Sequence, residues 1–248
     1  MAGHSKWANI RFRKGAQDAK RGKLFTKLIR EITVATKAGG PDPDNNPRLR
    51  SAIDKGLSNN MKRDTIETAV KKGSGAADSE NFDEIRYEGY GPAGTAVLVD
   101  CLTDNKNRTV AEVRHAFSKA GGNLGTSGSV DYMFQKLGVI NLSNELDEDS
   151  LMEAALDAGA EDVITHDDGT FEVLTQPDDF MTIRDALVEA GFPHEHAEVT
   201  LRADNLTPVE VKDAEKILRL LDVLEDLDDV QNVYSNADIP EEAIAGAE

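Results

Sequence analysis

Apolar residues in the first quarter of the chain recur at the spacing of amphipathic helices. Between residues 17 and 37 they stand three or four positions apart: Leu24, Phe25, Leu28, Ile29, Ile32 and Ala35. This spacing places them on one face of a helix. Gly39-Gly40-Pro41 ends that helix, and Asn46-Pro47 supplies the N-cap and first-turn proline that begin a second. With a third helix from about Arg63 to Gly73, the pattern predicts an all-helical N-terminal region.

Beyond this region the pattern changes to alternating strands and helices. The composition of residues 73–79, GSGAADS, indicates a linker at the change. The segment after the linker predicts strands at 82–88, 95–103 and 129–135 and a helix at 108–120, and the end of the chain predicts a helix at 209–227 and a strand at 230–235.

A complete β-α-β-β-α-β series lies between these two parts, which is the order of a ferredoxin-like unit. Its strands are predicted at 137–143, 161–166, 170–176 and 197–202, and its helices at 147–159 and 178–190. The flanking β-β-α-β and α-β parts are each incomplete. We therefore expect them to pair with one another into a single discontinuous domain.

These expectations define an α+β fold of three domains. An all-α helical domain comes first, and two α/β domains follow, the last of them ferredoxin-like and inserted into the second. The predicted boundaries are 1–78 for the helical domain, 79–135 plus 203–240 for the discontinuous domain and 136–202 for the inserted domain. A chain of 248 residues is long enough for several cores.

Charge is divided unequally between these regions. The formal net charge of the chain is −18, but residues 1–75 hold 17 basic and 7 acidic side chains. The remaining residues hold 11 basic and 39 acidic side chains. The average isoelectric point therefore describes neither part, and the helical domain is predicted to be cationic. The alternative is that this asymmetry serves solubility only.

Several further features indicate a cytoplasmic protein. No apolar run approaches the roughly 18 residues that a membrane-spanning helix needs, and the segment MAGHSKWANIRFRKG lacks the apolar stretch of a secretory signal. The single cysteine, Cys101, excludes a disulfide within the chain and a multi-cysteine zinc site.

The motifs that could carry enzymatic chemistry are weak. Residues 89–94 spell G-x-G-x-x-G, but they precede a strand and contain Pro92, so we interpret them as a hairpin turn rather than a dinucleotide site. His194 and His196 have no third metal ligand near them, and His115 is interpreted as structural. Cys101 lies in an apolar strand and is expected to be an inert buried thiol. The sequence therefore predicts no catalytic residue, no metal and no cofactor.

The dense basic segment at the N-terminus is the informative feature. Phosphate groups are bound by lysine point charges and arginine forks, and aromatic side chains among them can stack on bases. The helix positions in this set fall away from the apolar stripe, so we expect them to face solvent. The predicted nucleic-acid-binding residues are Lys6, Trp7, Arg11, Arg13, Lys14, Lys20, Arg21, Lys23, Lys27 and Arg30. For Trp7, packing onto the helical core is an equal alternative to base stacking.

Four long segments resemble the YebC family, whose mitochondrial members are translational activators of cytochrome c oxidase subunit one. They are GHSKWANI at 3–10, AQDAKRGKLFTKLIREI at 16–32, YEGYGPAGTAVLVDCLTDNKNRT at 87–109 and EVRHAFSKAGGNLGTSGSV at 112–130. The resemblance covers essentially the whole chain. It implies a helical domain followed by two α/β domains, and a role in gene expression.

The resemblance implies two functional roles. One is a DNA-binding transcriptional regulator, and the other is a ribosome-associated factor that helps synthesis through proline-rich stretches. We favour the ribosome, with ribosomal RNA or DNA as the nucleic-acid partner and basic ribosomal proteins as partners of the acidic domains. A third possibility is an acidic protein-binding adaptor whose basic end docks on its own acidic domains.

Overall fold

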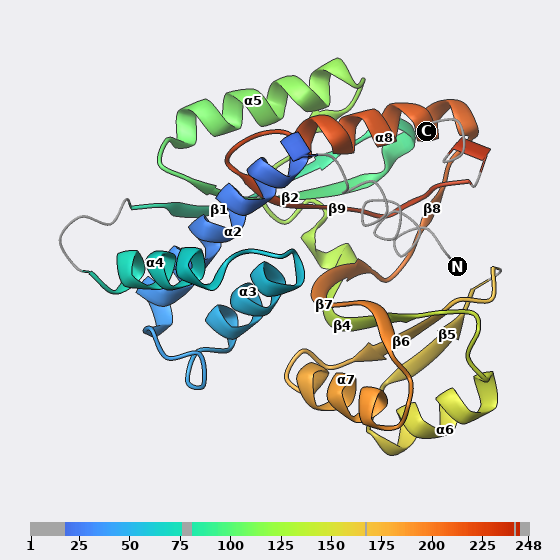
Figure 1. Cartoon of the computed structure of the whole chain (residues 1–248). Helices are drawn as coiled ribbons and strands as arrows, with labels where there is room; N and C mark the ends of the chain where they lie inside the picture. Colours follow the sequence, from blue (N-terminus) through green and yellow to red (C-terminus); the bar gives the residue numbers. More distant parts are fainter. Residues whose placement is uncertain (1–17, 76–80, 167, 241, 244–248) are drawn as a thin grey trace.

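The computed structural model describes residues 18–75, 81–166, 168–240 and 242–243. Its first three helices form a small bundle: α2 (Asp18–Gly39), α3 (Pro47–Ser58) and α4 (Arg63–Ser74). Figure 1 shows this bundle beside the rest of the molecule. Leu28, Ile32, Leu49 and Ile66 are buried between the helices and form their core, as the helical spacing of the apolar residues predicts.

Two residues fix how the helices of the bundle meet. The Asn46 side chain caps α3 by accepting a hydrogen bond from the Leu49 amide at 3.1 Å, and it donates to the Ala35 carbonyl of α2 at 2.8 Å. Gly73 lies in the last turn of α4, where a Cβ atom would stand 2.5 Å from the Thr33 carbonyl oxygen. The glycine is therefore needed for the close approach of α4 to α2. Residues 76–80 of the predicted linker lie outside the described residues.

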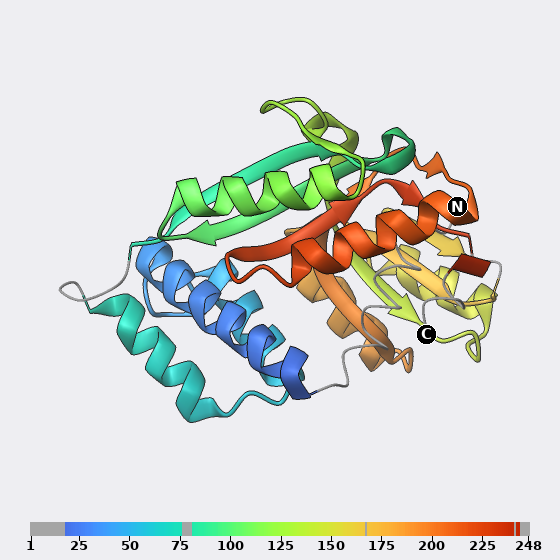
Figure 2. The same cartoon turned by 90° about the horizontal axis from the view of Figure 1, so that it is seen from above.

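An antiparallel sheet of strand order β3-β1-β2-β9 forms the second domain. Helices α5 (Lys106–Lys119) and α8 (Val211–Glu225) lie side by side over one face of this sheet (Figure 2). Phe117 of α5 and Leu221 of α8 are buried against Val97 and Val99 of β2. The strands are β1 (Asp83–Tyr90), β2 (Ala96–Thr103), β3 (Asn123–Leu124) and β9 (Val230–Ser235). A short parallel pair, β8 (Thr207–Pro208) with β10 (Ala237–Asp238), stands beside it.

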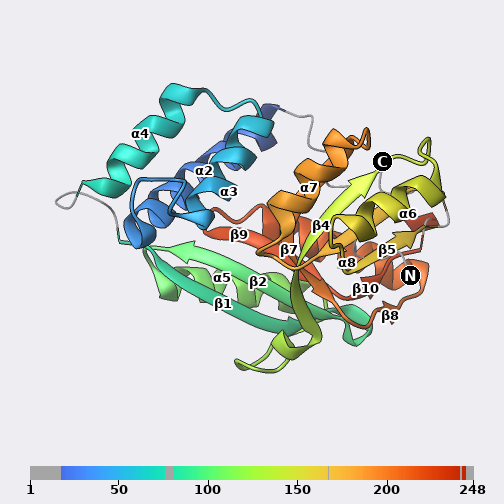
Figure 3. The same cartoon turned by 90° about the horizontal axis from the view of Figure 1, so that it is seen from below.

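The third domain is a four-stranded sheet of order β5-β6-β4-β7 with two helices on one face (Figure 3). Its elements follow one another as β4 (Phe134–Leu142), α6 (Glu148–Asp157), β5 (Asp162–Thr165), β6 (Phe171–Thr175), α7 (Phe180–Glu189) and β7 (His194–Ala203). This is the ferredoxin-like order. Ile140, Val173 and Ile183 are buried in its own core.

The third domain leaves and re-enters the second domain at one place, because Phe134 at the start of β4 pairs with Ala203 at the end of β7. β9 follows this insertion in the sequence and pairs with β2, which precedes it. The predicted α+β fold class, with a ferredoxin-like unit inserted into the second α/β domain, is confirmed. The domain boundaries themselves stay a prediction.

One pair of predicted strands is wrong. The sequence analysis places strands at 129–135 and 137–143, but residues 131–133 form a 3₁₀ turn and a single strand, β4, runs from Phe134 to Leu142. The chain before this turn follows Glu88, whose carboxylate accepts hydrogen bonds from the amides of Gly128, Val130 and Asp131 at 2.6–2.9 Å. Amides bound to a buried side chain cannot join a strand ladder, and sequence alternation alone does not reveal this contact.

None of the helices in the described part of the chain is both long enough and apolar enough to cross a membrane.

Candidate nucleic-acid interface

The polar face of α2 is in contact with the second domain. The Lys23 ammonium donates to the Asp226 carbonyl oxygen at 3.0 Å, and the Lys27 ammonium donates to the Glu225 carbonyl oxygen at 2.6 Å. Arg30 donates to the Asp228 carbonyl at 2.9 Å, and its guanidinium lies 4.7 Å from the centre of the Phe82 ring. We call Lys23, Lys27 and Arg30 the docking face. Its Arg30 side chain is only 16% exposed, so the expected solvent-facing position is wrong for this residue.

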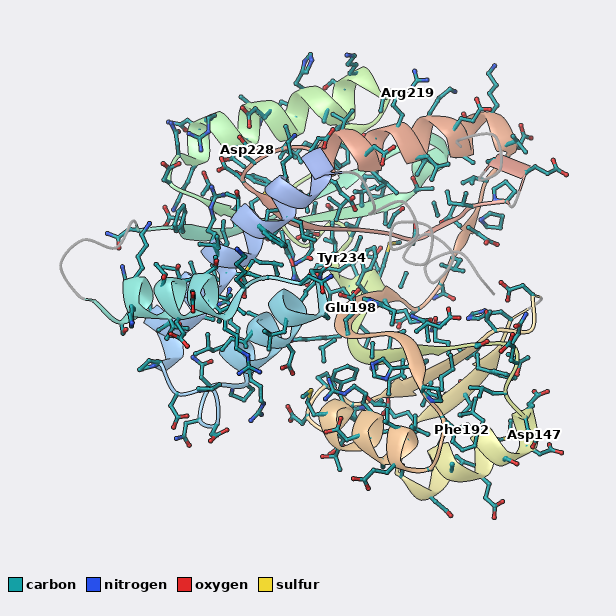
Figure 4. The ribbon with its side chains drawn as sticks, viewed as in Figure 1. Asp147, Phe192, Glu198, Arg219, Asp228 and Tyr234 are labelled. Atoms are coloured by element: carbon teal, nitrogen blue, oxygen red, sulfur yellow. The ribbon has the colours of Figure 1, made fainter. Side chains whose placement is uncertain are left out.

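The docking face meets the turn between α8 and β9, residues 225–229, which we call the acidic turn. Its sequence is Glu-Asp-Leu-Asp-Asp, and Figure 4 shows Asp228 at the place where α2 approaches α8. The carbonyl end of a helix carries partial negative charge, so acidic residues there concentrate negative potential. The three cations of α2 therefore bind at the most electronegative end of α8.

Asp229 is the buried member of the acidic turn. Its side chain is 3% exposed and accepts hydrogen bonds from Arg108 at 2.6 Å, Thr109 at 2.8 Å and Thr103 at 3.0 Å. Arg30 of the docking face lies 3.3 Å from the same carboxylate. Burial opposes ionisation of this carboxyl group, but the donors, Arg108 first among them, outweigh burial and lower its pKa.

Sequence reasoning did not find Asp229. The segment CLTDNKNRT at 101–109 supplies three of its donors, but the carboxylate lies more than a hundred positions further along the chain. No spacing signal joins such distant positions. Only the pairing of β9 with β2 brings them together.

Two further ion pairs join the helical domain to the acidic domains. Arg48 of α3 reaches Glu84 of β1 at 2.8 Å, and its hydrogen bonds to Glu31 and Glu84 raise its pKa against the effect of burial. Lys55 of α3 reaches Glu198 of β7 at 3.0 Å, and Glu198 stands in the third domain in Figure 4. In each pair the cation belongs to the helical domain.

The apolar clusters of the described residues divide differently. The core of the helical domain contains only residues between Leu24 and Val70. Among the described residues, therefore, no buried apolar cluster joins the helical domain to the others. The second and third domains share one, in which Leu98 of β2 packs with Phe134 and Ala203 at the ends of the insertion.

A second set of basic side chains points away from the acidic domains. Lys62, Arg63 and Lys71 on and beside α4 are exposed, and α4 forms the outer edge of the molecule in Figures 1 to 3. The sequence analysis did not single them out, because Asp64 and Glu67 interrupt them. Their placement on the outer helix, visible only in the fold, makes them candidates for phosphate contact.

The other predicted interface residues are not placed by the structure. Lys6, Trp7, Arg11, Arg13 and Lys14 lie outside the described residues. Lys20 and Arg21 belong to the first turns of α2, and their side chains are not among those described. Contact of all these residues with nucleic acid stays a prediction.

The remaining candidates for chemistry have structural positions. Residues 89–94 form the turn between the antiparallel strands β1 and β2. Cys101 is buried, and burial raises the pKa of its thiol to about 12, so it is a poor nucleophile. Within the described residues, no group of three or more histidine, cysteine or carboxylate side chains is arranged to hold a metal ion.

The fold and the site define a class: a three-domain α+β protein whose cationic helical domain sits on two acidic domains. The sequence-family descriptions "TACO1/YebC protein N-terminal domain" and "TACO1/YebC second and third domain" match residues 5–76 and 82–237. The chain belongs to the TACO1/YebC family.

Similar proteins cover almost the whole chain. A probable transcriptional regulatory protein of Methylococcus capsulatus is 70% identical over 99% of both chains, and one of Idiomarina loihiensis is 62% identical over 99% of this chain and 98% of its own. The crystal structure of a conserved hypothetical protein from Aquifex aeolicus has a TM-score of 0.79 at 46% identity, covering 90% of this chain and 92% of that one.

Proposed function

We propose that this protein is a non-enzymatic, cytoplasmic regulator of gene expression that binds nucleic acid through its basic helical domain. The observation that carries the proposal is the reversal of charge along the chain, with 17 basic and 7 acidic residues in 1–75 against 11 and 39 in the remainder. Lysine and arginine bind phosphate, whereas an acidic surface is repelled by it. The names of the relatives, probable transcriptional regulatory proteins, agree with such a role.

Within this role we favour a ribosome-associated factor that helps synthesis through proline-rich stretches. The exposed cations beside and on α4 are mostly lysines, which bind charge without reading bases. The inserted domain, residues 136–202, carries 17 acidic and 3 basic side chains. Such a surface needs a cationic partner, and ribosomes offer basic proteins together with dense RNA phosphate. A DNA-binding transcriptional regulator is the second candidate, which the relatives' names favour.

Nucleic-acid binding can be tested by fluorescence anisotropy with a labelled 20-nucleotide RNA and a DNA of the same sequence. Replacing Lys6, Arg11, Arg13 and Lys14 with Gln should weaken binding by about tenfold or more and lower the salt dependence by up to about four counterions. The matched control replaces the exposed Arg114, Lys119, Lys212 and Arg219 of α5 and α8 with Gln. Equal effects of the two variants would refute the assignment to the N-terminal segment.

The two roles are separated by sedimentation with ribosomes and by a promoter-fragment shift. We expect co-sedimentation that weakens with salt, and DNA binding that depends little on sequence. Binding of a promoter fragment about a thousandfold tighter than scrambled DNA, without ribosome association at low salt, would establish the transcriptional role instead.

A further inference from the structure

The contact between the helical domain and the acidic domains has the composition of an interface that can open. Among the described residues it consists of cations on one side and oxygen acceptors on the other, with no shared apolar cluster. Partly exposed ion pairs contribute little to stability and are screened by salt. Domains joined by small polar interfaces move relative to one another unless apolar packing holds them.

The acidic turn presents to α2 the kind of oxygen array that a phosphate backbone presents. Lys27 binds one carbonyl oxygen, and Arg30 lies against the carbonyls of Leu102 and Asp228 and the carboxylate of Asp229. These are the charge-dense oxygen acceptors that lysine and arginine also find on phosphate groups. Arg30 cannot bind both partners at once, because its side chain is 84% covered in the docked state.

Local stability does not explain the sequence of the acidic turn. Glu225, Asp226 and Asp228 add negative charge at the carbonyl end of α8, where acidic residues are unfavourable. Asp226 is balanced by Lys23, at 3.5 Å from its carboxylate. The turn therefore gains from a cationic partner, and α2 supplies one from the helical domain.

We propose that the docking face and the acidic turn form a reversible clamp, and that the phosphate backbone of nucleic acid competes with the acidic turn for the docking face. The acidic turn is then an internal substitute for phosphate that limits the affinity of the closed protein. Opening the clamp frees Lys27 and Arg30 and enlarges the cationic surface. This inference rests on the proposed function, because it concerns regulation of the same basic domain.

Opening can be measured by energy transfer within the full chain. Ser51→Cys on α3 and Ser118→Cys on α5 place one dye on each side of the clamp at exposed serines, and the buried Cys101 does not compete for labelling. We expect transfer efficiency to fall when a 20-nucleotide single-stranded RNA is added and when salt is raised to about 0.5 M, where charge interactions are screened.

A variant of the turn tests the competition. Asp226→Asn with Asp228→Asn removes two exposed charges from the acidic turn and leaves the buried Asp229 in place. We expect this variant to bind the RNA at least about threefold tighter than a matched control, Asp149→Asn with Asp157→Asn on α6, which removes the same charge far from the clamp. Thermal unfolding verifies that both variants fold.

The outcomes distinguish the clamp from the proposed function. RNA binding accompanied by falling transfer, with the turn variant tighter than the control, supports the clamp. RNA binding at constant transfer, or equal affinity of the turn and control variants, overturns the clamp and leaves the proposed function standing. If neither the wild type nor the turn variant binds RNA or DNA, both the clamp and the proposed function fail.

Discussion

At the scale of single residues, the side chains that matter most are carboxylates whose partners lie far away in sequence. Asp229 gathers Thr103, Arg108 and Thr109 with Arg30, and Glu88 holds the chain from Gly128 to Asp131. A sequence gives the local pattern of such residues but not their distant donors. The apolar residues of α2, in contrast, were predicted correctly because every neighbour that defines their helical face lies within four positions.

We expect Asp229→Asn to lower the free energy of unfolding by about 2–4 kcal/mol, because it leaves buried donors without their charged acceptor. Urea unfolding measures this loss. The neighbouring Asp228→Asn is the control, since its side chain is exposed, and it should stay within about 0.5 kcal/mol of the wild type. A loss no larger than that of the control would show that Asp229 has little structural weight.

The lowered pKa values of Asp229 and Glu88 predict a loss of stability in acid. A carboxyl group whose pKa is lower in the folded state stabilises the fold above its unfolded value, roughly pH 4, and this contribution disappears as pH falls further. We therefore expect the unfolding midpoint to decrease below about pH 4. The decrease should be shallower for Asp229→Asn, and identical slopes in the two proteins would contradict the assignment.

At the scale of elements, the connection between α2 and α3 depends on one amide side chain. Asn46 has two roles, because its oxygen caps α3 while its nitrogen donates to the carbonyls of Ala35 and Gly40. Sequence reasoning identified the cap correctly from Asn46-Pro47. It did not identify the second role, because the carbonyl of Ala35 becomes a neighbour only when the helices pack.

This double role predicts an unusual order among substitutions. Aspartate is as good an N-cap as asparagine, so a cap alone would tolerate Asn46→Asp. In the buried position observed here, a carboxylate would face two carbonyl oxygens, and we expect a loss of about 2 kcal/mol or more. Asn46→Ser, which keeps a small capping side chain without charge, should be less harmful. Thermal unfolding compares them, and a neutral Asn46→Asp would show that the cap is the only role.

At the scale of the whole molecule, the sequence predicted the order of the domains but not how they meet. The incomplete β-β-α-β and α-β parts were correctly expected to pair around the inserted unit. The basic face of α2 was expected to face solvent, yet Arg30 is largely covered by the second domain. Helical periodicity separates polar from apolar positions, but it does not distinguish solvent from a charged neighbouring domain.

The discontinuous domain predicts that the insertion can be removed. Because Phe134 and Ala203 pair, the two ends are close enough for a short turn to join them. We expect a chain in which Gly-Asn-Gly replaces residues 136–201 to keep its helical content and unfold cooperatively, and we expect residues 134–203 alone to fold on their own core. Circular dichroism and amide spectra test both. Failure of both pieces would mean that their shared cluster around Leu98 is indispensable.

The position of β9 has a consequence for how the protein is made. Residues 104–229 separate β9 from β2, so at about 5–20 residues per second the ribosome takes roughly 6–25 s to deliver the missing strand. The helical domain and the inserted domain are continuous and can be completed earlier, whereas the second domain closes last. Until then the hydrogen-bonding edge of β2 is open beside Val97 and Val99. A nascent chain stalled in this interval therefore exposes an apolar strand that can pair with another chain.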